Sequence, residues 1–341
     1  MKKSIYFLKD GHVDWLEQLA LNDDNYNFKF RNINIDYNKA QKRLIRVLSV
    51  HQYYIKLAFK TVKSAKKDDL IICWLDLIGL YTYFFLLIFR KKNKILVLNL
   101  MVNNDGSFIS IFKKYLFQNF LNNKNNYFTL TSNHLKNLYF EYFPNCNRNN
   151  FFILNDTYED LFDLTKKDSQ IINKNSIFCG GRNSRDWNVA FEIAKMNPEF
   201  EFIYVVPNKD VVPKEVSKNI SLYENISKNK FNTLISSCSI VILPLKTDAP
   251  AGLIVLYLAG LLKKTLIISD SLSVRDYIVD DVNGIVIKNP QIDNFNISIR
   301  RLLEDHNCKN KLSKSLYETV ISKGSPDSFY NSLLKIIDSI K

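Results

Sequence analysis

Short apolar runs alternate with longer segments of helical periodicity twice along this chain, on either side of a polar stretch at residues 160–175. Brief apolar runs between polar clusters are typical of buried strands. Strands that alternate with helices predict parallel sheets covered on both faces. The pattern predicts an α/β chain with two Rossmann-like domains, residues 1–165 and 166–325, and a last helix at 326–341. That helix either closes the second domain or crosses back to the first.

The expected elements follow these two patterns. Strands are expected at residues 4–8, 70–74, 95–100, 128–131, 151–154, 177–179, 201–206, 220–223, 240–243, 265–268 and 285–287. Helices are expected at residues 43–63, 80–89, 109–121, 135–143, 187–196, 230–236, 252–262, 274–279, 294–304 and 327–340.

One segment, residues 70–89, is almost entirely apolar and ends at Arg90-Lys91-Lys92. An apolar stretch of about twenty residues can span a bilayer. Asp76 interrupts this one, so we expect a buried strand followed by a helix. A contact of its aromatic side chains with a membrane surface, with the three cations on anionic head groups, stays open.

Composition narrows the range of partners. The net charge of +13 suits an anionic partner such as a phosphorylated substrate or a membrane surface, although a general lysine-rich bias would also explain part of it. No interleaved basic–aromatic motif is present, so no nucleic-acid partner is expected. The five cysteines form no paired motif and the four histidines lie far apart, which predicts a reducing compartment and no metal site. The first apolar run is too short for a signal peptide, and the expected location is the cytoplasm.

Glycine is scarce, with nine in 341 residues. Gly180 and Gly181 follow an expected strand and precede an expected helix. Such a turn directs free backbone N–H groups at the helix N-terminus toward an anion. Arg182 and Arg185 add guanidinium groups suited to phosphate, and Asp186 can cap the helix. An ordinary turn with two surface arginines is the alternative that the residues leave open.

A second turn of the same kind lies between the strand at 240–243 and Gly252, which opens the next expected helix. Two helix N-termini that face one crevice would hold a diphosphate between them. Ligands of open α/β sheets lie at the carboxyl ends of the strands, which fits this placement. The alternative is that residues 253–262 are simply a buried apolar helix.

Several segments, in the right order, resemble the retaining family-4 (group 1) glycosyltransferases. Residues 178–196 resemble the first strand, turn and helix of that family's C-terminal domain, and residues 240–287 resemble its donor-site core. Upstream, residues 131–135 and 151–156 resemble the end of its N-terminal domain.

The resemblance implies a GT-B fold, in which two Rossmann-like domains with parallel sheets face a central cleft and the second domain holds a nucleotide sugar. It implies no metal and no cofactor, because the nucleoside-diphosphate sugar is the donor substrate and basic side chains neutralise its leaving diphosphate. Arg182 and Arg185 match the family's basic pair at the diphosphate and are the predicted catalytic residues. The predicted donor-binding residues are Gly180, Gly181, Asp248, Pro250, Ala251, Gly252, Leu253 and Tyr257.

The chain departs from the family at two glutamates. The first falls here on Ala249 or Pro250. The second falls on Tyr257 or Leu258, and Asp248 is the nearest carboxylate. The sugar and ribose contacts that these glutamates make in the family are therefore left without an obvious counterpart.

The predicted function is that of a retaining, metal-independent hexosyltransferase. It would move a sugar from a nucleoside-diphosphate donor to a glycan or lipid-linked acceptor in the synthesis of cell-envelope polysaccharide, such as lipopolysaccharide or capsule. The missing glutamates motivate a second hypothesis, a catalytically lapsed partner or scaffold with the GT-B fold. A nucleotide-sugar epimerase on the same fold is a third. Within the cytoplasm, a peripheral contact with the inner face of the membrane stays open.

Overall fold

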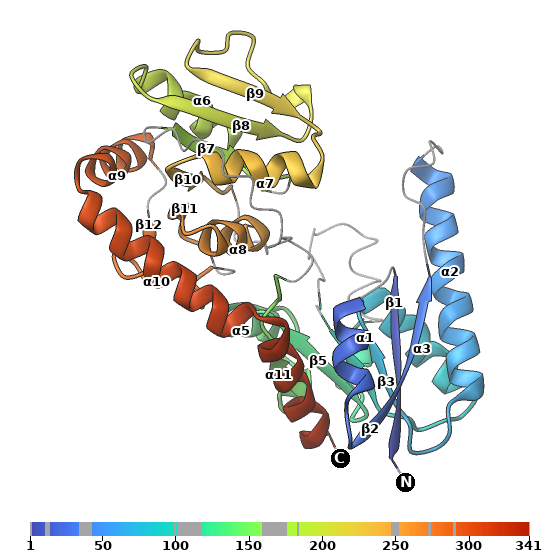
Figure 1. Cartoon of the computed structure of the whole chain (residues 1–341). Coiled ribbons are helices and arrows are strands. Elements are labelled where there is room, and N and C mark those ends of the chain that lie inside the picture. Colours follow the sequence, from blue (N-terminus) through green and yellow to red (C-terminus); the bar gives the residue numbers. More distant parts are fainter. Residues whose placement is uncertain are drawn as a thin grey trace. The chain divides into compact units, whose positions relative to one another are not determined.

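The chain folds into two compact units, shown in Figure 1. Unit 1 comprises Met1–Asn155 and Tyr330–Lys341, and unit 2 comprises Asp156–Phe329. The expected boundary at residues 165 and 166 lies outside the described residues. The structure is a computed structural model that describes residues 2–10, 14–33, 43–98, 100, 117–158, 176–182, 184–246, 252–271, 274–288 and 291–340.

Unit 1 is built on a parallel sheet. Its strands are β1 (Lys3–Asp10), β2 (Tyr26–Ile33), β3 (Leu70–Cys73), β4 (Ile95–Val97), β5 (Asn126–Leu130) and β6 (Phe151–Ile153). Its helices are α1 (Asp14–Leu21), α2 (Arg43–Ser64), α3 (Asp76–Ile88) and α5 (Asn133–Tyr142), followed by a 3-10 turn at Arg148–Asn150. The six strands lie in the order β2-β1-β3-β4-β5-β6, and every neighbouring pair is parallel. Of the helix expected at 109–121, residues 109–116 lie outside the described residues and 117–121 are helical.

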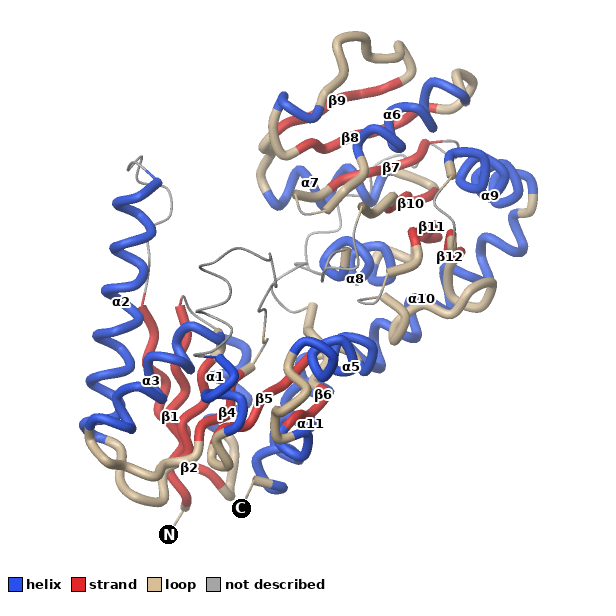
Figure 2. Tube along the Cα trace, turned by 180° about the vertical axis from the view of Figure 1, so that it is seen from behind, coloured by secondary structure: helices blue, strands red, loops and turns tan. Residues whose placement is uncertain are grey.

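The apolar segment at residues 70–89 forms β3 and α3, which confirms the expected strand and helix. All four residues of β3 are buried. Helix α3 packs beside α2, as both views show (Figures 1 and 2). Among the described residues, no helix combines the length and the apolar content needed to cross a bilayer.

The sequence patterns missed α1 and β2 in unit 1. Strand β2 alternates apolar and polar residues, whereas the search relied on continuous apolar runs. As an edge strand, it needs apolar side chains on only one face. Its Phe28 ring lies 6.1 Å from that of Phe30 and 6.2 Å from that of Tyr330, near the C-terminus.

The last helix, α11 (Pro326–Ser339), belongs to unit 1 from Tyr330 onward. The Tyr330 hydroxyl donates to Asp23 Oδ2 at 2.9 Å. The Tyr26 hydroxyl donates to Asp338 Oδ1. These bonds fasten the end of the chain beside the edge strand of the first sheet.

Unit 2 repeats the architecture. Its strands are β7 (Ser176–Gly180), β8 (Glu201–Val206), β9 (Ile220–Glu224), β10 (Ile240–Leu243), β11 (Thr265–Ser269) and β12 (Ile285–Ile287). Its helices are α6 (Trp187–Met196), α7 (Lys228–Ser237), α8 (Leu253–Leu261), α9 (Ile292–Glu304) and α10 (His306–Gly324), with a 3-10 turn at Lys209–Val211. The six strands lie in the order β12-β11-β10-β7-β8-β9, again all parallel. The expected α/β fold with two parallel sheets is therefore confirmed.

Helices cover both faces of the second sheet (Figure 2). Alternate residues of β10 enter different cores, as the period of a strand requires. Ile240 and Ile242 pack with α6 and α9, whereas Val241 and Leu243 pack with α7, α8 and α10. Because both faces are buried, β10 reads in sequence as a continuous apolar run.

Two expectations fail in unit 2. Residues 274–279, expected to be helical, contain a turn at 274–277 and no helix. Helix α10 was not expected at all. Its buried apolar stripe is only one residue wide, with Leu312, Leu316 and Val320 four residues apart among Lys, Ser and Asn. So narrow a stripe gives little helical periodicity to detect.

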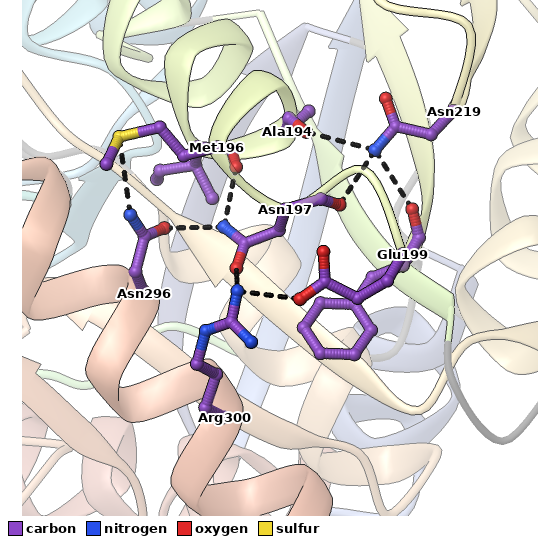
Figure 3. A network of polar contacts seen from close by, with 9 residues as sticks. Ala194, Met196, Asn197, Glu199, Asn219, Asn296 and Arg300 are labelled. Atoms are coloured by element: carbon purple, nitrogen blue, oxygen red, sulfur yellow. Dashed lines mark hydrogen bonds and ion pairs between the residues drawn. The ribbon is translucent and has the colours of Figure 1, made fainter.

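The amino edge of the second sheet is closed by a network of polar side chains, shown in Figure 3. Asn197, just after α6, has no exposed surface. Its amide donates to the carbonyl of Ile193 at 2.7 Å and to Asn296 Oδ1 at 2.7 Å. Its oxygen accepts from Arg300 at 2.9 Å, and Arg300 pairs with Glu199 at 2.6 Å. This network ties the end of α6 to α9.

Other carbonyls at the same edge are satisfied in the same way. The Asn219 amide donates to three backbone carbonyls around the end of α6 (Figure 3). Lys264 Nζ donates to the carbonyls of Ser236 and Cys238 at the end of α7, both at 2.7 Å. The helix C-termini that reach this edge therefore find their hydrogen-bond donors within the protein.

Candidate anion-binding site

The strand order of unit 2 brings the two glycine turns to one place. Strand β7 lies between β8 and β10, because the chain first builds the sheet on one side of β7 and then returns to the other. Ligands of open α/β sheets bind at the carboxyl ends of the strands at such a switch point. The turn at Gly180 and Gly181 follows β7, and the turn that ends at Gly252 follows β10.

Backbone contacts join the segments that follow β7 and β10. Arg185 and Leu245 form an isolated antiparallel bridge. Two hydrogen bonds flank it, from the Asp186 N–H to the Pro244 carbonyl at 2.8 Å and from the Lys246 N–H to the Ser184 carbonyl at 3.0 Å. The loop after β7 is thus held in register against the segment that follows β10.

Leu245 also reaches the second turn. A Cβ built on Gly252 would lie 3.7 Å from the side chains of Leu243, Leu245 and Ile268, at the carboxyl ends of β10 and β11. The Leu245 N–H donates to Ser269 Oγ at 3.0 Å. Leu245 therefore contacts both glycine turns and fixes their separation.

The glycines serve different purposes. Gly181 and Gly252 have φ of 125° and 92°, a conformation that favours glycine. Gly180 has no such backbone requirement. A Cβ there would lie 2.6 Å from the ring of Phe178 and 2.8 Å from that of Phe231, so glycine is needed for close packing.

Arg185 is buried, with 6% of its surface exposed. Its Nε donates to the Gly180 carbonyl at 2.9 Å, which fixes the guanidinium at the end of β7. Burial lowers the pKa of Arg185 by desolvation, while the neighbouring Cys179 raises it. Arginine stays charged in proteins, so Arg185 places a buried positive charge at the end of β7.

Arg182 and Lys246 provide exposed positive charge at the same edge. Arg182 donates to Asn225 Oδ1, after β9, at 3.3 Å. Within the described ranges, neither cation has a carboxylate partner. The nearby Asp270 is committed to Arg275, with two hydrogen bonds of 2.9 Å.

The helix N-termini at this edge differ in their caps. Asp186 caps α6 by accepting from the Val189 N–H at 3.3 Å, and Ser227 caps α7. Helix α8 begins after Gly252, which has no side chain to accept a bond. Within the described residues, no side chain caps its first N–H groups, and these carry the positive end of the helix dipole.

Tyr257 and Leu253 are both buried in the core of unit 2. The Tyr257 hydroxyl donates to the carbonyl of Asp156 at 2.8 Å, and burial raises its pKa. Its ring packs edge-on against those of Tyr158 and Tyr277. This placement engages Tyr257 with the first residues of unit 2, and its predicted contact with a donor stays a prediction.

The predicted residues Asp248, Pro250 and Ala251 lie outside the described residues. Sequence reasoning did not identify Leu245, Lys246 or Ser269 as part of this edge. A basic residue directly after an apolar strand was the available signal for Lys246, but nothing local distinguishes Leu245. In the part of the chain that the structure describes, no three His, Cys, Asp or Glu side chains gather as metal ligands.

Residues 213–319 match the family model described as Glycosyl transferases group 1. No curated protein sequence matches the chain. Sucrose-phosphate synthase from Thermosynechococcus elongatus has a similar structure, with a TM-score of 0.74 at 11% identity over 99% of each chain. HepE of Anabaena, in complex with UDP, gives a TM-score of 0.73 at 12% identity over 99% of this chain and 100% of that one. The apo form of the lipopolysaccharide outer core galactosyltransferase WaaB gives 0.66 at 12% identity over 98% and 99%.

At these identities the likeness of the structures establishes the fold. The family model covers much of the unit that carries the two glycine turns, and the structures cover nearly the whole chain. The two findings agree and confirm the resemblance seen in the sequence: this chain has the GT-B fold, and its second unit carries the match to the group 1 glycosyltransferases.

Proposed function

We propose that the chain is a glycosyltransferase that moves a sugar from a nucleoside-diphosphate donor to an acceptor. The observation that supports this most is the meeting of two glycine turns at the switch point of the second sheet, joined through Leu245. The uncapped start of α8 and the cations at this edge suit a diphosphate, which accepts many hydrogen bonds and carries negative charge.

The proposed chemistry is charge stabilisation on the leaving group. The bond between the anomeric carbon and the diphosphate oxygen breaks, and the diphosphate leaves with the bonding electrons. The acceptor oxygen forms the new bond to the anomeric carbon, and its hydroxyl proton passes to the leaving diphosphate. Arg185 and Arg182 stabilise the charge that grows on the diphosphate. A metal-independent reaction is proposed because basic side chains and helix amides supply this stabilisation. Retention of configuration is proposed from the resemblance to the retaining family-4 glycosyltransferases.

A glycan or lipid-linked acceptor of the cell envelope is the proposed second substrate. Its support is the shared fold with WaaB, which acts on the lipopolysaccharide outer core, and the basic charge of the chain. The proposed location is the cytoplasm, with the protein peripheral at the inner face of the membrane, where a lipid-linked acceptor would be reached.

Calorimetry with UDP tests the donor site. Arg182→Gln and Lys246→Gln are expected to weaken UDP binding by about 10-fold each, because each removes one charge-assisted contact. Lys195→Gln, on the exposed side of α6, removes the same charge and is the matched control. Equal affinity of all three variants would contradict the proposed site.

The lapsed scaffold remains the second candidate, and one observation favours it. One family glutamate falls here on Tyr257 or Leu258. The Tyr257 hydroxyl donates to the carbonyl of Asp156, and Leu258 is buried. Calorimetry with a panel of nucleoside diphosphates separates the two, since a scaffold would bind none of them.

A further inference from the structure

Unit 1 exposes a group of large apolar side chains where α2 and α3 pack side by side (Figure 1). Phe84 is 54% exposed, Ile88 56% and Phe59 40%. The Phe59 ring lies 5.4 Å from that of Phe85 and 5.7 Å from that of Phe89, so the group is continuous across both helices. We name it the aromatic patch; its members are Ile55, Phe59, Phe84, Phe85, Ile88 and Phe89.

A row of lysines borders this patch on α2. Lys56, Lys60 and Lys63 are exposed and lie four and three residues apart, which places them on one side of the helix next to Phe59. With Arg31 of β2 they line a groove of about 1210 Å³, and Phe59 lines both the groove and the patch. We name these four cations the basic row.

The basic row has no carboxylate partner among the residues that the structure describes. Arg31 donates only to hydroxyls, Thr61 Oγ1 at 3.2 Å and Ser64 Oγ at 2.8 Å. The charged residues in the sequence around the basic row are also all positive. No Asp or Glu occurs at residues 37–67 or 77–104, the stretches that contain almost all of α2 and α3. All charged side chains of α2 are therefore basic, and Asp76, at the start of α3, is the one carboxylate of these two helices.

We propose that the aromatic patch and the basic row form a docking surface for an anionic lipid bilayer. Aromatic and aliphatic side chains would enter the interface between head groups and acyl chains, while the lysines and Arg31 contact lipid phosphates. Charge complementarity selects this occupant. A second copy docked by the same face would bring one basic row against another, and that repulsion opposes self-association.

The three cations after α3 divide between two roles. Lys91 is turned inward, where its Nζ donates to the carbonyls of Val62 at 2.6 Å and Ala65 at 2.7 Å, at the end of α2. Arg90 and Lys92 are exposed beside the patch. Lys91 thus holds α2 and α3 together, and only its two neighbours add to the lipid-facing charge.

This surface goes beyond the proposed transfer reaction, because docking requires neither donor nor acceptor. Co-sedimentation of the purified full chain with vesicles therefore tests it separately from the binding of UDP. We expect binding to vesicles rich in phosphatidylglycerol, little binding to pure phosphatidylcholine, and weaker binding as salt rises from low to physiological ionic strength.

The charge variant is Lys56→Gln/Lys60→Gln/Lys63→Gln. It is expected to weaken partition onto phosphatidylglycerol vesicles by about 100-fold, from the typical contribution of each lysine near an anionic surface. The matched control, Lys209→Gln/Lys214→Gln/Lys218→Gln, removes the same charge from exposed positions of unit 2. The proposal is wrong if both triple variants bind like the wild type or lose binding equally.

The apolar variant is Phe84→Gln/Ile88→Gln, at positions that are 54% and 56% exposed. It is expected to lower vesicle binding by at least about 10-fold, whereas Ile297→Gln/Val279→Gln, at equally exposed positions of unit 2, is not. Light scattering is the second measurement. A dimer that Phe84→Gln/Ile88→Gln dissociates, in a protein that ignores vesicles, would assign the surface to a second copy instead and overturn the proposal.

Discussion

The two edges of the second sheet differ in how the free backbone groups at the helix ends find hydrogen-bond partners. At the amino edge, where the helices end, the protein meets the free carbonyls with its own donors, Asn197, Asn219 and Lys264. At the carboxyl edge, where the helices begin, α8 has no side-chain cap, and Arg182 and Lys246 have no carboxylate partner in the described ranges. A parallel sheet with antiparallel helices creates this polarity. The comparison teaches that the amino edge contributes stability, and that the carboxyl edge is where we propose that an anionic ligand binds.

The largest effect is expected from Arg185→Ala at the carboxyl edge. Transfer, or hydrolysis of a UDP-sugar donor, should fall by about 100-fold or more, because one preorganised cation is lost where charge develops. Steady-state kinetics on variants with wild-type circular dichroism measures it. Arg185→Lys keeps the charge, and its rate of transfer is expected to lie between those of the wild type and Arg185→Ala. Unchanged donor binding and transfer in Arg185→Ala would contradict the proposed role of the carboxyl edge in binding the diphosphate.

At the amino edge, Asn197→Ala is expected to lower the free energy of unfolding by about 3 kcal/mol. It removes three hydrogen bonds, two of them buried, and leaves their partners without it. Urea denaturation measures this loss, and UDP affinity at low urea should match that of the wild type. An Asn197→Ala protein that is stable but binds UDP poorly would show that the two edges are not separate in function.

A buried thiol at each edge predicts loss of stability in alkali. Burial raises the pKa of Cys179, beside Gly180, and of Cys238, before β10, to about 12. The folded state therefore keeps these protons while the unfolded chain loses them above about pH 9, so the stabilisation is complete below pH 9 and is lost as pH rises toward 12. At pH 10 each thiol should cost about 1 kcal/mol, measured by urea denaturation at pH 8 and 10. Cys179→Ala and Cys238→Ala should each reduce the difference.

The smallest effect is expected from Tyr257→Phe. The variant loses one hydrogen bond, to the carbonyl of Asp156, and should lower the free energy of unfolding by about 1 kcal/mol. Thermal denaturation measures it. Weaker UDP binding without any loss of stability would instead support the predicted donor contact of Tyr257 and extend the binding edge along α8.

The sequence patterns predicted most of the fold because they are local. Strand β10 is a continuous apolar run, and α6 carries a regular apolar stripe, so both were located at their observed bounds. Strand β2 and helix α10 were missed for the opposite reason. Each buries only a narrow set of side chains, which leaves little apolar pattern to detect.

The candidate site was predicted in part. Gly181 and Gly252 were found because scarce glycine marks backbone with positive φ. Leu245 was missed, since its value comes from contacting both turns at once, which no local pattern encodes. The sequence likewise predicted that residues 70–89 form a strand and a helix instead of one membrane-spanning segment. It did not distinguish Lys91, which donates to a carbonyl at the end of α2, from its exposed neighbours.

By itself, the sequence determined the alternation of strands and helices, the two glycine turns and the excess of positive charge, because periodicity, glycine and charge are properties of neighbouring residues. The tertiary structure alone decided where these features meet. It placed both turns at the switch point of one sheet and buried Tyr257 in the core of unit 2. It also placed the lysines of α2 beside the aromatic side chains that α2 and α3 share. These contacts depend on long-range packing, because the residues involved are far apart in the chain.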